Sequence, residues 1–203
     1  MGNQKEEMGW GDRLSVDPES GAAWHEPGDE AFGRQVSPAL DTPQQRRALV
    51  ALSLVPGLGA ARIRALLAYL RSPVAVWKAA RSQLESVPGV GPSVSEAILT
   101  FDDHDAVDRQ MRRAEAVGAK LITPWDDAFP DRLRQIYDPP VFLWVRGDLS
   151  CVHSGAVAIV GTRRCTDYGR QQAARFAAEL VRHGLPVVSG LAYGVDTAAH
   201  RGA

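Results

Sequence analysis

The chain has 203 residues, of which 45% are hydrophobic and 23% are charged, and its formal net charge is −1. This composition is typical of a globular protein, the length allows one large domain or two small ones, and no apolar run is long enough for a transmembrane helix. The charge is uneven, because residues 1–43 hold three basic and nine acidic residues while the remainder holds 20 basic and 15 acidic. Eighteen of those 20 cations are arginines, which suit forked contacts with phosphate and therefore permit nucleic-acid binding.

The N-terminal segment, residues 1–43, is predicted to be a disordered acidic tail, because it is rich in Gly, Pro, Ser, Asp and Glu and shows no sustained period. It contains no apolar core of a secretory signal. The two cysteines, Cys151 and Cys165, have neither the number of a disulfide scaffold nor the spacing of a metal site. We therefore expect a cytoplasmic protein with no membrane partner, no bound metal and no cofactor.

Residues 44–119 are predicted to form an all-helical domain. The helical pattern opens at Thr42 and Pro43, an N-cap residue followed by a proline of the first turn, and about five helices follow before residue 101. One more helix is expected over 103–119, ended by Gly118 in the manner of a glycine C-cap.

Within this domain the pattern Pro-Gly-hydrophobe-Gly occurs twice, 32 residues apart, and a helix follows each copy. Such helix–hairpin–helix elements grip a nucleic-acid backbone, because glycines allow close approach and the next helix offers its N–H groups. The candidate accessory DNA contacts are Gly57, Gly59, Arg62, Gly89 and Gly91. The alternative is that the hairpins only turn corners in a helical bundle.

Residues 120–203 are predicted to form an α/β domain with a parallel sheet. Short apolar runs predict strands, and helical patterns follow the last two of them: strands at 120–124, 141–148, 156–160 and 185–190, and helices at 168–183 and from about 194. Strand–helix–strand–helix at this spacing indicates right-handed crossovers between parallel strands. The chain stops inside the last helix, so we expect the sheet to be truncated.

A loop of Gly161-Thr162-Arg163-Arg164 joins a predicted strand to a helix, where N–H groups and the helix dipole can hold an anion. The loop lacks the spacing of the ATP and dinucleotide fingerprints, and Ser189-Gly190 stands where a dinucleotide fold needs an acid. Both loops are expected at the same edge of the sheet. The predicted phosphate site is Gly161, Thr162, Arg163, Arg164, Ser189 and Gly190, and the alternative is that one arginine only pairs with Asp167.

Asp196 and His200 lie four residues apart, hence on one face of the final helix. They could be a metal pair or an acid–base pair. Two ligands without a third do not make a metal site, so we favour a structural hydrogen bond between the two side chains.

The combined motifs resemble those of the DprA/Smf family of DNA-processing proteins. The resemblance rests on residues 158–203, with their Gly-Thr-Arg, Tyr-Gly and Ser-Gly-Leu-Ala-x-Gly-Val-Asp-x-x-Ala-His patterns, on the stretch 129–149, and on the tandem hairpins. It covers roughly residues 44–203. It implies a helical, SAM-like domain followed by a Rossmann-like domain that continues, in the family, beyond residue 203.

The resemblance further implies a cytoplasmic bacterial protein of competence that binds single-stranded DNA. Members protect incoming DNA in natural transformation and load the RecA recombinase onto it for recombination, as homodimers and without being enzymes. Their phosphate contacts would fall on Gly161, Thr162, Arg163, Ser189 and Gly190. Because the family's dimer surface, RecA-facing surface and further DNA contacts lie beyond residue 203, this chain is expected neither to dimerise nor to bind DNA tightly.

The residues alone leave two other functions open. One is a Rossmann-like nucleotide-binding enzyme that hydrolyses nucleoside monophosphates, which would need a carboxylate at the mouth of the phosphate loop. The other is that residues 44–119 form only a protein-interaction bundle.

Overall fold

The computed structural model describes residues 42–152 and 155–203 and is a mixed α/β structure of helices and two small sheets. The predicted tail lies outside the described residues, except for its last two. Helices occur where the sequence predicts them in the first part of the chain: α1 (Pro43–Leu54), α2 (Ala60–Leu70), α3 (Pro73–Lys78), α4 (Arg81–Glu85), α5 (Pro92–Leu99) and α6 (His104–Ala116).

The ends and the buried faces of these helices follow from local chemistry. Thr42 caps α1 by accepting a hydrogen bond through Oγ1 from the Gln45 N–H at 3.3 Å, as predicted from the Thr-Pro pair. Beyond α6, Gly118 has a φ of 67°, in agreement with its predicted role. Burial of apolar side chains stabilises this part of the chain, and its core is formed chiefly by Leu49, Leu52, Ile63, Leu66, Val76, Leu84, Val87 and Ile98.

The first sheet is an antiparallel pair, β1 (Lys120–Ile122) and β2 (Leu143–Val145). Its side chains Leu121 and Trp144 pack, together with Phe142, against the buried residues of α1 and α6. The two strands therefore share a core with the helices, although their apolar runs belong to the predicted α/β segment 120–203. Between them lies a short helix, α7 (Asp131–Arg134), which the sequence pattern did not predict.

The second sheet is parallel, as predicted, and belongs to the series β3 (Val157–Ala158), α8 (Asp167–Arg182), β4 (Val187–Val188) and α9 (Val195–Gly202). Each strand has only two residues, fewer than the apolar runs suggested. Helices α8 and α9 pack through small residues, because each buries two alanines and Gly202 lies against the backbone of Ala174. The two helix backbones therefore approach each other closely.

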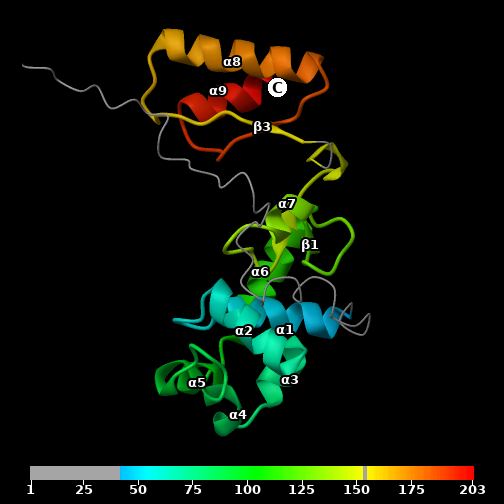
Figure 1. Cartoon of the computed structure of the whole chain (residues 1–203), viewed down its shortest axis with the longest axis vertical. Helices are drawn as coiled ribbons and strands as arrows, with labels where there is room; N and C mark the ends of the chain where they lie inside the picture. The colour runs from blue at the N-terminus through cyan, green and yellow to red at the C-terminus, as the bar shows by residue number, and fades with distance from the viewer. Residues whose placement is uncertain (1–41, 153–154) are drawn as a thin grey trace, which may run out of the picture.

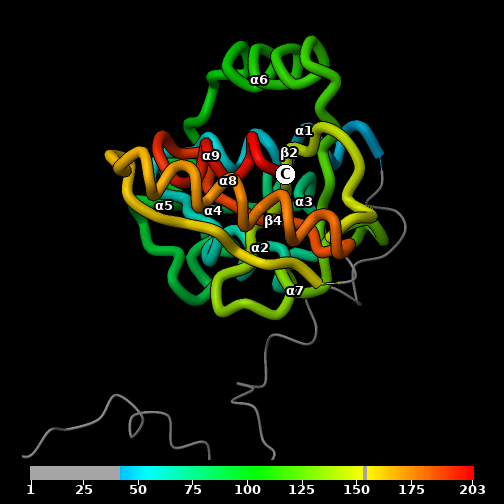
Figure 2. The backbone as a smooth tube through the Cα atoms, turned by 90° about the horizontal axis from the view of Figure 1, so that it is seen from above, coloured from blue at the N-terminus to red at the C-terminus, as the bar shows by residue number. Residues whose placement is uncertain are grey.

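The elements are spread along one long axis (Figure 1). Helices α1 to α5 lie at one end, α6, α7 and β1 in the middle, and α8, α9 and β3 at the other end. Seen along that axis, α6 lies at one side of the molecule (Figure 2). No helix within the described ranges is both long and apolar enough to cross a membrane.

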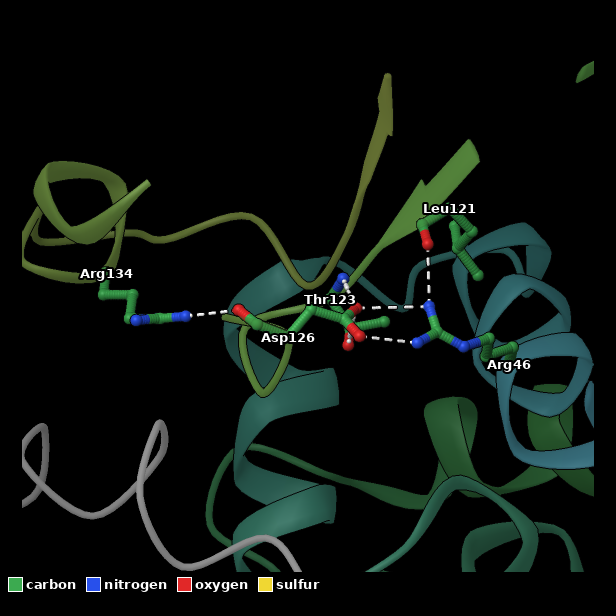
Figure 3. A network of polar contacts seen from close by, with 5 residues as sticks. All are labelled: Arg46, Leu121, Thr123, Asp126 and Arg134. Carbon is green, nitrogen blue, oxygen red and sulfur yellow. Dashed lines mark hydrogen bonds and ion pairs between the residues drawn. The ribbon is translucent and has the colours of Figure 1, made fainter. Parts of the chain in front are cut away.

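A network of polar contacts joins α1 to the segment that follows β1 (Figure 3). Arg46 donates through Nη2 to Asp126 Oδ1 at 2.6 Å and through Nη1 to the Leu121 carbonyl at 2.7 Å. Asp126 Oδ2 accepts from the N–H and the hydroxyl of Thr123 at 2.6 and 2.7 Å, and Arg134 donates to the Asp126 carbonyl at 2.6 Å. Burial opposes ionisation of Asp126, but the hydrogen bonds from Arg46 and Thr123 outweigh it and lower its pKa.

This network predicts a stability loss on neutralising Asp126. The Arg46 and Asp126 side chains are only 19% and 18% exposed, whereas the ion pair of Arg47 and Asp108 is 41% and 42% exposed. We expect Asp126→Asn to lower the free energy of unfolding by about 2 kcal/mol, because it weakens charge-assisted hydrogen bonds that are shielded from water. The matched control Asp108→Asn should cost less than about 0.5 kcal/mol. Urea unfolding followed by tryptophan fluorescence measures both, and equal losses would contradict the assigned importance of Asp126.

The lowered pKa of Asp126 also predicts a pH dependence. A carboxyl with a folded pKa below its ordinary value of 3.8 contributes stability above that value and loses it as the pH falls through the folded pKa. The difference in unfolding free energy between the unaltered protein and Asp126→Asn should therefore shrink when urea unfolding is repeated in increasingly acid buffers. A difference that stays constant down to strongly acid pH would show that charge is not its source.

Candidate phosphate-binding site

Two loops follow the carboxyl ends of the parallel strands. The first loop, residues 159–166, leads from β3 into α8, and the second loop, residues 189–194, leads from β4 into α9. Both helices begin at the same end of this part of the molecule, at the left in Figure 1. The structure thus brings the two predicted segments together at one edge of the sheet, where open α/β sheets place their ligands.

The two loops are in direct contact. The Val195 N–H donates to the Thr162 carbonyl at 3.3 Å. Gly194, with a φ of 85°, lies so close to the first loop that a Cβ atom would overlap the carbonyl oxygens of Thr162 and Arg163. Only glycine combines this backbone conformation with this close approach, so Gly194 sets the distance between the loops.

The carboxylate of Asp196 fastens both loops. Its Oδ1 accepts from the Gly161 N–H at 3.2 Å and its Oδ2 from the Gly190 N–H at 3.1 Å, and the residue is 5% exposed. Burial alone would raise the pKa of Asp196, but hydrogen bonds from the N–H groups of Gly161, Gly190 and Ala192 outweigh it and lower the pKa. Asp196 is therefore an ionised, buried group that holds the two glycines at a fixed separation.

Sequence reasoning missed this role. It predicted a hydrogen bond between Asp196 and His200. In the structure the Asp196 carboxylate accepts from backbone N–H groups instead, and His200 is exposed. No group of three or more potential metal ligands occurs in the part of the chain that the structure describes. The available signal was an acid in the first turn of a helix that follows a glycine-bounded loop, where carboxylates commonly accept backbone N–H bonds.

Several of the predicted phosphate ligands are used inside the protein. The N–H groups of Gly161 and Gly190 are bonded to Asp196, and the Ser189 hydroxyl donates to the Ile159 carbonyl at 2.7 Å. Thr162 Oγ1 accepts from the Arg164 N–H at 3.2 Å. These groups shape the loops, and their contact with phosphate stays a prediction.

The side chains of Arg163 and Arg164 are exposed. Among residues 42–152 and 155–203, neither guanidinium forms an ion pair or a hydrogen bond. The alternative that one of them pairs with Asp167 is wrong, because the ion-pair partner of Asp167 is Arg170, at 3.3 Å. The first loop therefore carries two adjacent positive charges that no described acid neutralises.

The tandem hairpins are held to each other by Arg62. Its Nε donates to the Gly89 carbonyl at 2.8 Å and its Nη1 to the Gly57 carbonyl at 2.7 Å, so one guanidinium spans both turns. Gly57 and Gly89 have φ values of 76° and 80°, and Gly59 and Gly91 are the N-cap residues of α2 and α5. Arg62 thus has a structural role, while DNA contact at the hairpins stays a prediction.

Comparison with known proteins shows which family the chain resembles. Residues 120–203 match the family described as DNA recombination-mediator protein A. The chain is 42% identical over 112 residues to the putative DNA processing protein DprA of Mycobacterium tuberculosis, covering 49% of this chain and 28% of that protein. It is 31% identical over 155 residues to the protein Smf of Synechocystis sp., covering 74% of this chain and 39% of that protein.

Among solved structures, the X-ray structure of DNA processing protein A (DprA) from Streptococcus pneumoniae is similar, with a TM-score of 0.59 and 28% sequence identity. The match covers 77% of this chain and 53% of that one. The chain belongs to the DprA/Smf family, as its motifs predicted. It spans only 28% and 39% of the two curated relatives named above.

Because Asp196 holds both loops, replacing its carboxylate should loosen the backbone at the two glycines that it contacts. We expect Asp196→Asn to speed hydrogen exchange at the Gly161 and Gly190 amides, because one carboxylate that accepts from both is replaced by an amide with a single acceptor oxygen. Exchange measured residue by residue by NMR tests this, with His200→Ala as the matched control on the same helix. Unchanged protection in Asp196→Asn, or equal loss in the control, would contradict the assigned role.

Proposed function

We propose that the chain is the DNA-binding part of a recombination mediator that binds single-stranded DNA in the cytoplasm. In this proposal the whole protein is a non-catalytic homodimer that protects incoming DNA during natural transformation and loads the RecA recombinase onto it. The observation that carries the proposal is the pair Arg163 and Arg164. Both are exposed and unpaired among the described residues, and they lie in the segment that matches a family of DNA recombination mediators.

Single-stranded DNA fits this surface better than a small nucleotide does. Two neighbouring guanidinium groups can each pair with one phosphate, and a single strand carries one phosphate per nucleotide, so it can satisfy both arginines at once. The loop beneath them is held by Asp196, so little backbone freedom is lost on binding. Binding through phosphates is tolerant of sequence and sensitive to salt.

An enzyme that hydrolyses nucleoside monophosphates would need a free carboxylate beside the phosphate loop. Asp196 is beside that loop, but both of its oxygens accept backbone N–H bonds and the residue is buried. A carboxylate held in this way is a poor general base, because deprotonating water would break bonds that favour its ionised form. Incubation with nucleoside monophosphates, followed by chromatography for free base, decides between the two functions; release of base would contradict the proposal.

The proposal predicts that the two arginines carry the affinity for DNA. Replacing Arg163 or Arg164 with alanine should weaken binding to oligo-dT by about tenfold each, because each substitution removes a charge-assisted hydrogen bond to phosphate. The slope of log affinity against log salt should fall by about 0.7 for each phosphate that is no longer neutralised. Fluorescence anisotropy with a labelled oligo-dT, repeated over a series of salt concentrations, measures both quantities.

Arg182→Ala is the matched control for this experiment. Arg182 lies in the last turn of α8, at the opposite end of the helix from the first loop, and pairs with Glu179. Its removal should leave the affinity and the salt slope unchanged. Equal weakening by all three substitutions would indicate diffuse electrostatic attraction and would contradict a site at the first loop.

A further inference from the structure

The second loop presents two large apolar side chains to solvent. Leu191 is 81% exposed and Tyr193 is 83% exposed, while Ala192 between them is partly buried. Other large apolar side chains of this part, such as Tyr168 and Phe176, are exposed as well. What distinguishes the pair is its place on the loop that contacts the first loop, whose two arginines have no partner among the described residues. An aromatic side chain and two arginines thus belong to two loops whose backbones are in contact.

The backbone of this loop is held in an unusual conformation. Leu191 has a φ of 56°, and Arg71 is the only other non-glycine residue in the described ranges with positive φ. Arg71 is explained by its place as the C-cap of α2. No helix ends at Leu191, and side chains of this kind adopt positive φ only where the surroundings impose it, most often at functional sites.

The surroundings that impose it are hydrogen bonds on either side of Leu191. The Gly190 N–H donates to Asp196 at 3.1 Å. The Ala192 carbonyl accepts from the hydroxyl and the N–H of Thr197 at 2.6 and 3.1 Å. Hydrogen bonds thus hold the loop backbone at Gly190 and at Ala192, directly before Tyr193.

Tyr193 is also adjacent to the charged loop. Its neighbour Gly194 lies against the carbonyl oxygens of Thr162 and Arg163, so the backbone of Tyr193 is next to that of Arg163. Aromatic rings beside arginines are the elements with which proteins bind single strands, since the ring stacks on a base and the cations hold the phosphates.

We propose that Tyr193 is a base-stacking residue, which holds one base of a single strand while Arg163 and Arg164 hold the adjoining phosphates. The proposal rests on the function proposed above and adds that bases, as well as phosphates, contribute to affinity. A duplex hides the faces of its bases, so stacking at Tyr193 favours single strands over duplexes.

The test compares oligo-dT with an abasic oligonucleotide of the same length, which keeps the phosphates and lacks the bases. Tyr193→Ala should weaken binding of oligo-dT by about tenfold and leave binding of the abasic strand and the salt slope unchanged, because the substitution removes only the stacking of the ring on a base. Tyr193→Phe keeps the ring and should bind oligo-dT like the unaltered protein. Tyr137→Ala removes an aromatic side chain that is 97% exposed in the stretch between α7 and β2, and as the matched control it should change nothing.

Each outcome separates the two proposals. If the unaltered protein binds neither strand, not even weakly, the proposed function is overturned. If the unaltered protein binds oligo-dT and Tyr193→Ala binds it equally well, the stacking role is overturned. The proposed function then stands, because binding does not depend on the ring. If Tyr193→Ala weakens both strands equally, the residue acts through the shape of the loops, which also overturns stacking.

Discussion

The carboxylate of Asp196 accepts hydrogen bonds from Gly161 and Gly190, which belong to different loops, and the rest of the candidate site depends on this arrangement. Because these N–H groups are satisfied within the protein, the loops need no ligand to hold their shape. The charge that can meet a phosphate comes instead from Arg163 and Arg164, which project from the first loop without a described acidic partner. A rigid base with long, exposed side chains suits a flexible polymer, whose phosphates vary in position from one bound segment to the next.

Elsewhere, too, a charged side chain that bonds to backbone groups joins segments that are distant in sequence. Arg46 of α1 donates to the carbonyl of Leu121 in β1, 75 residues away, and also pairs with the side chain of Asp126. Arg62 joins the two hairpin turns by donating to both glycine carbonyls. These bonds stabilise the helical part and β1–β2 as one packed body. Arg62, whose sequence context suggested DNA contact, therefore already has partners within the protein.

Interactions between residues close in the sequence were predictable, whereas those between distant residues were not. Helix starts and ends were predictable, because Thr42 and Gly118 act within one turn of the helix that they delimit. The two loops were predictable from strand, glycine and helix in succession. The bonds of Asp196 and Arg62 were not, since they depend on segments that fold together only in three dimensions. The pairing of β1 with β2 on the helices likewise follows from tertiary packing, which periodicity does not encode.

The most direct test of the central claim is to map where a single strand contacts the protein. Titration of the isotope-labelled protein with oligo-dT, followed by NMR, reports the contact at each backbone amide. We expect the largest chemical-shift changes at residues 162–164 and 191–194, with small changes at the hairpin turns 56–59 and 88–91. Changes confined to the hairpin turns, or spread evenly over the basic surface, would contradict the assignment of the phosphate site to the two loops that Asp196 holds.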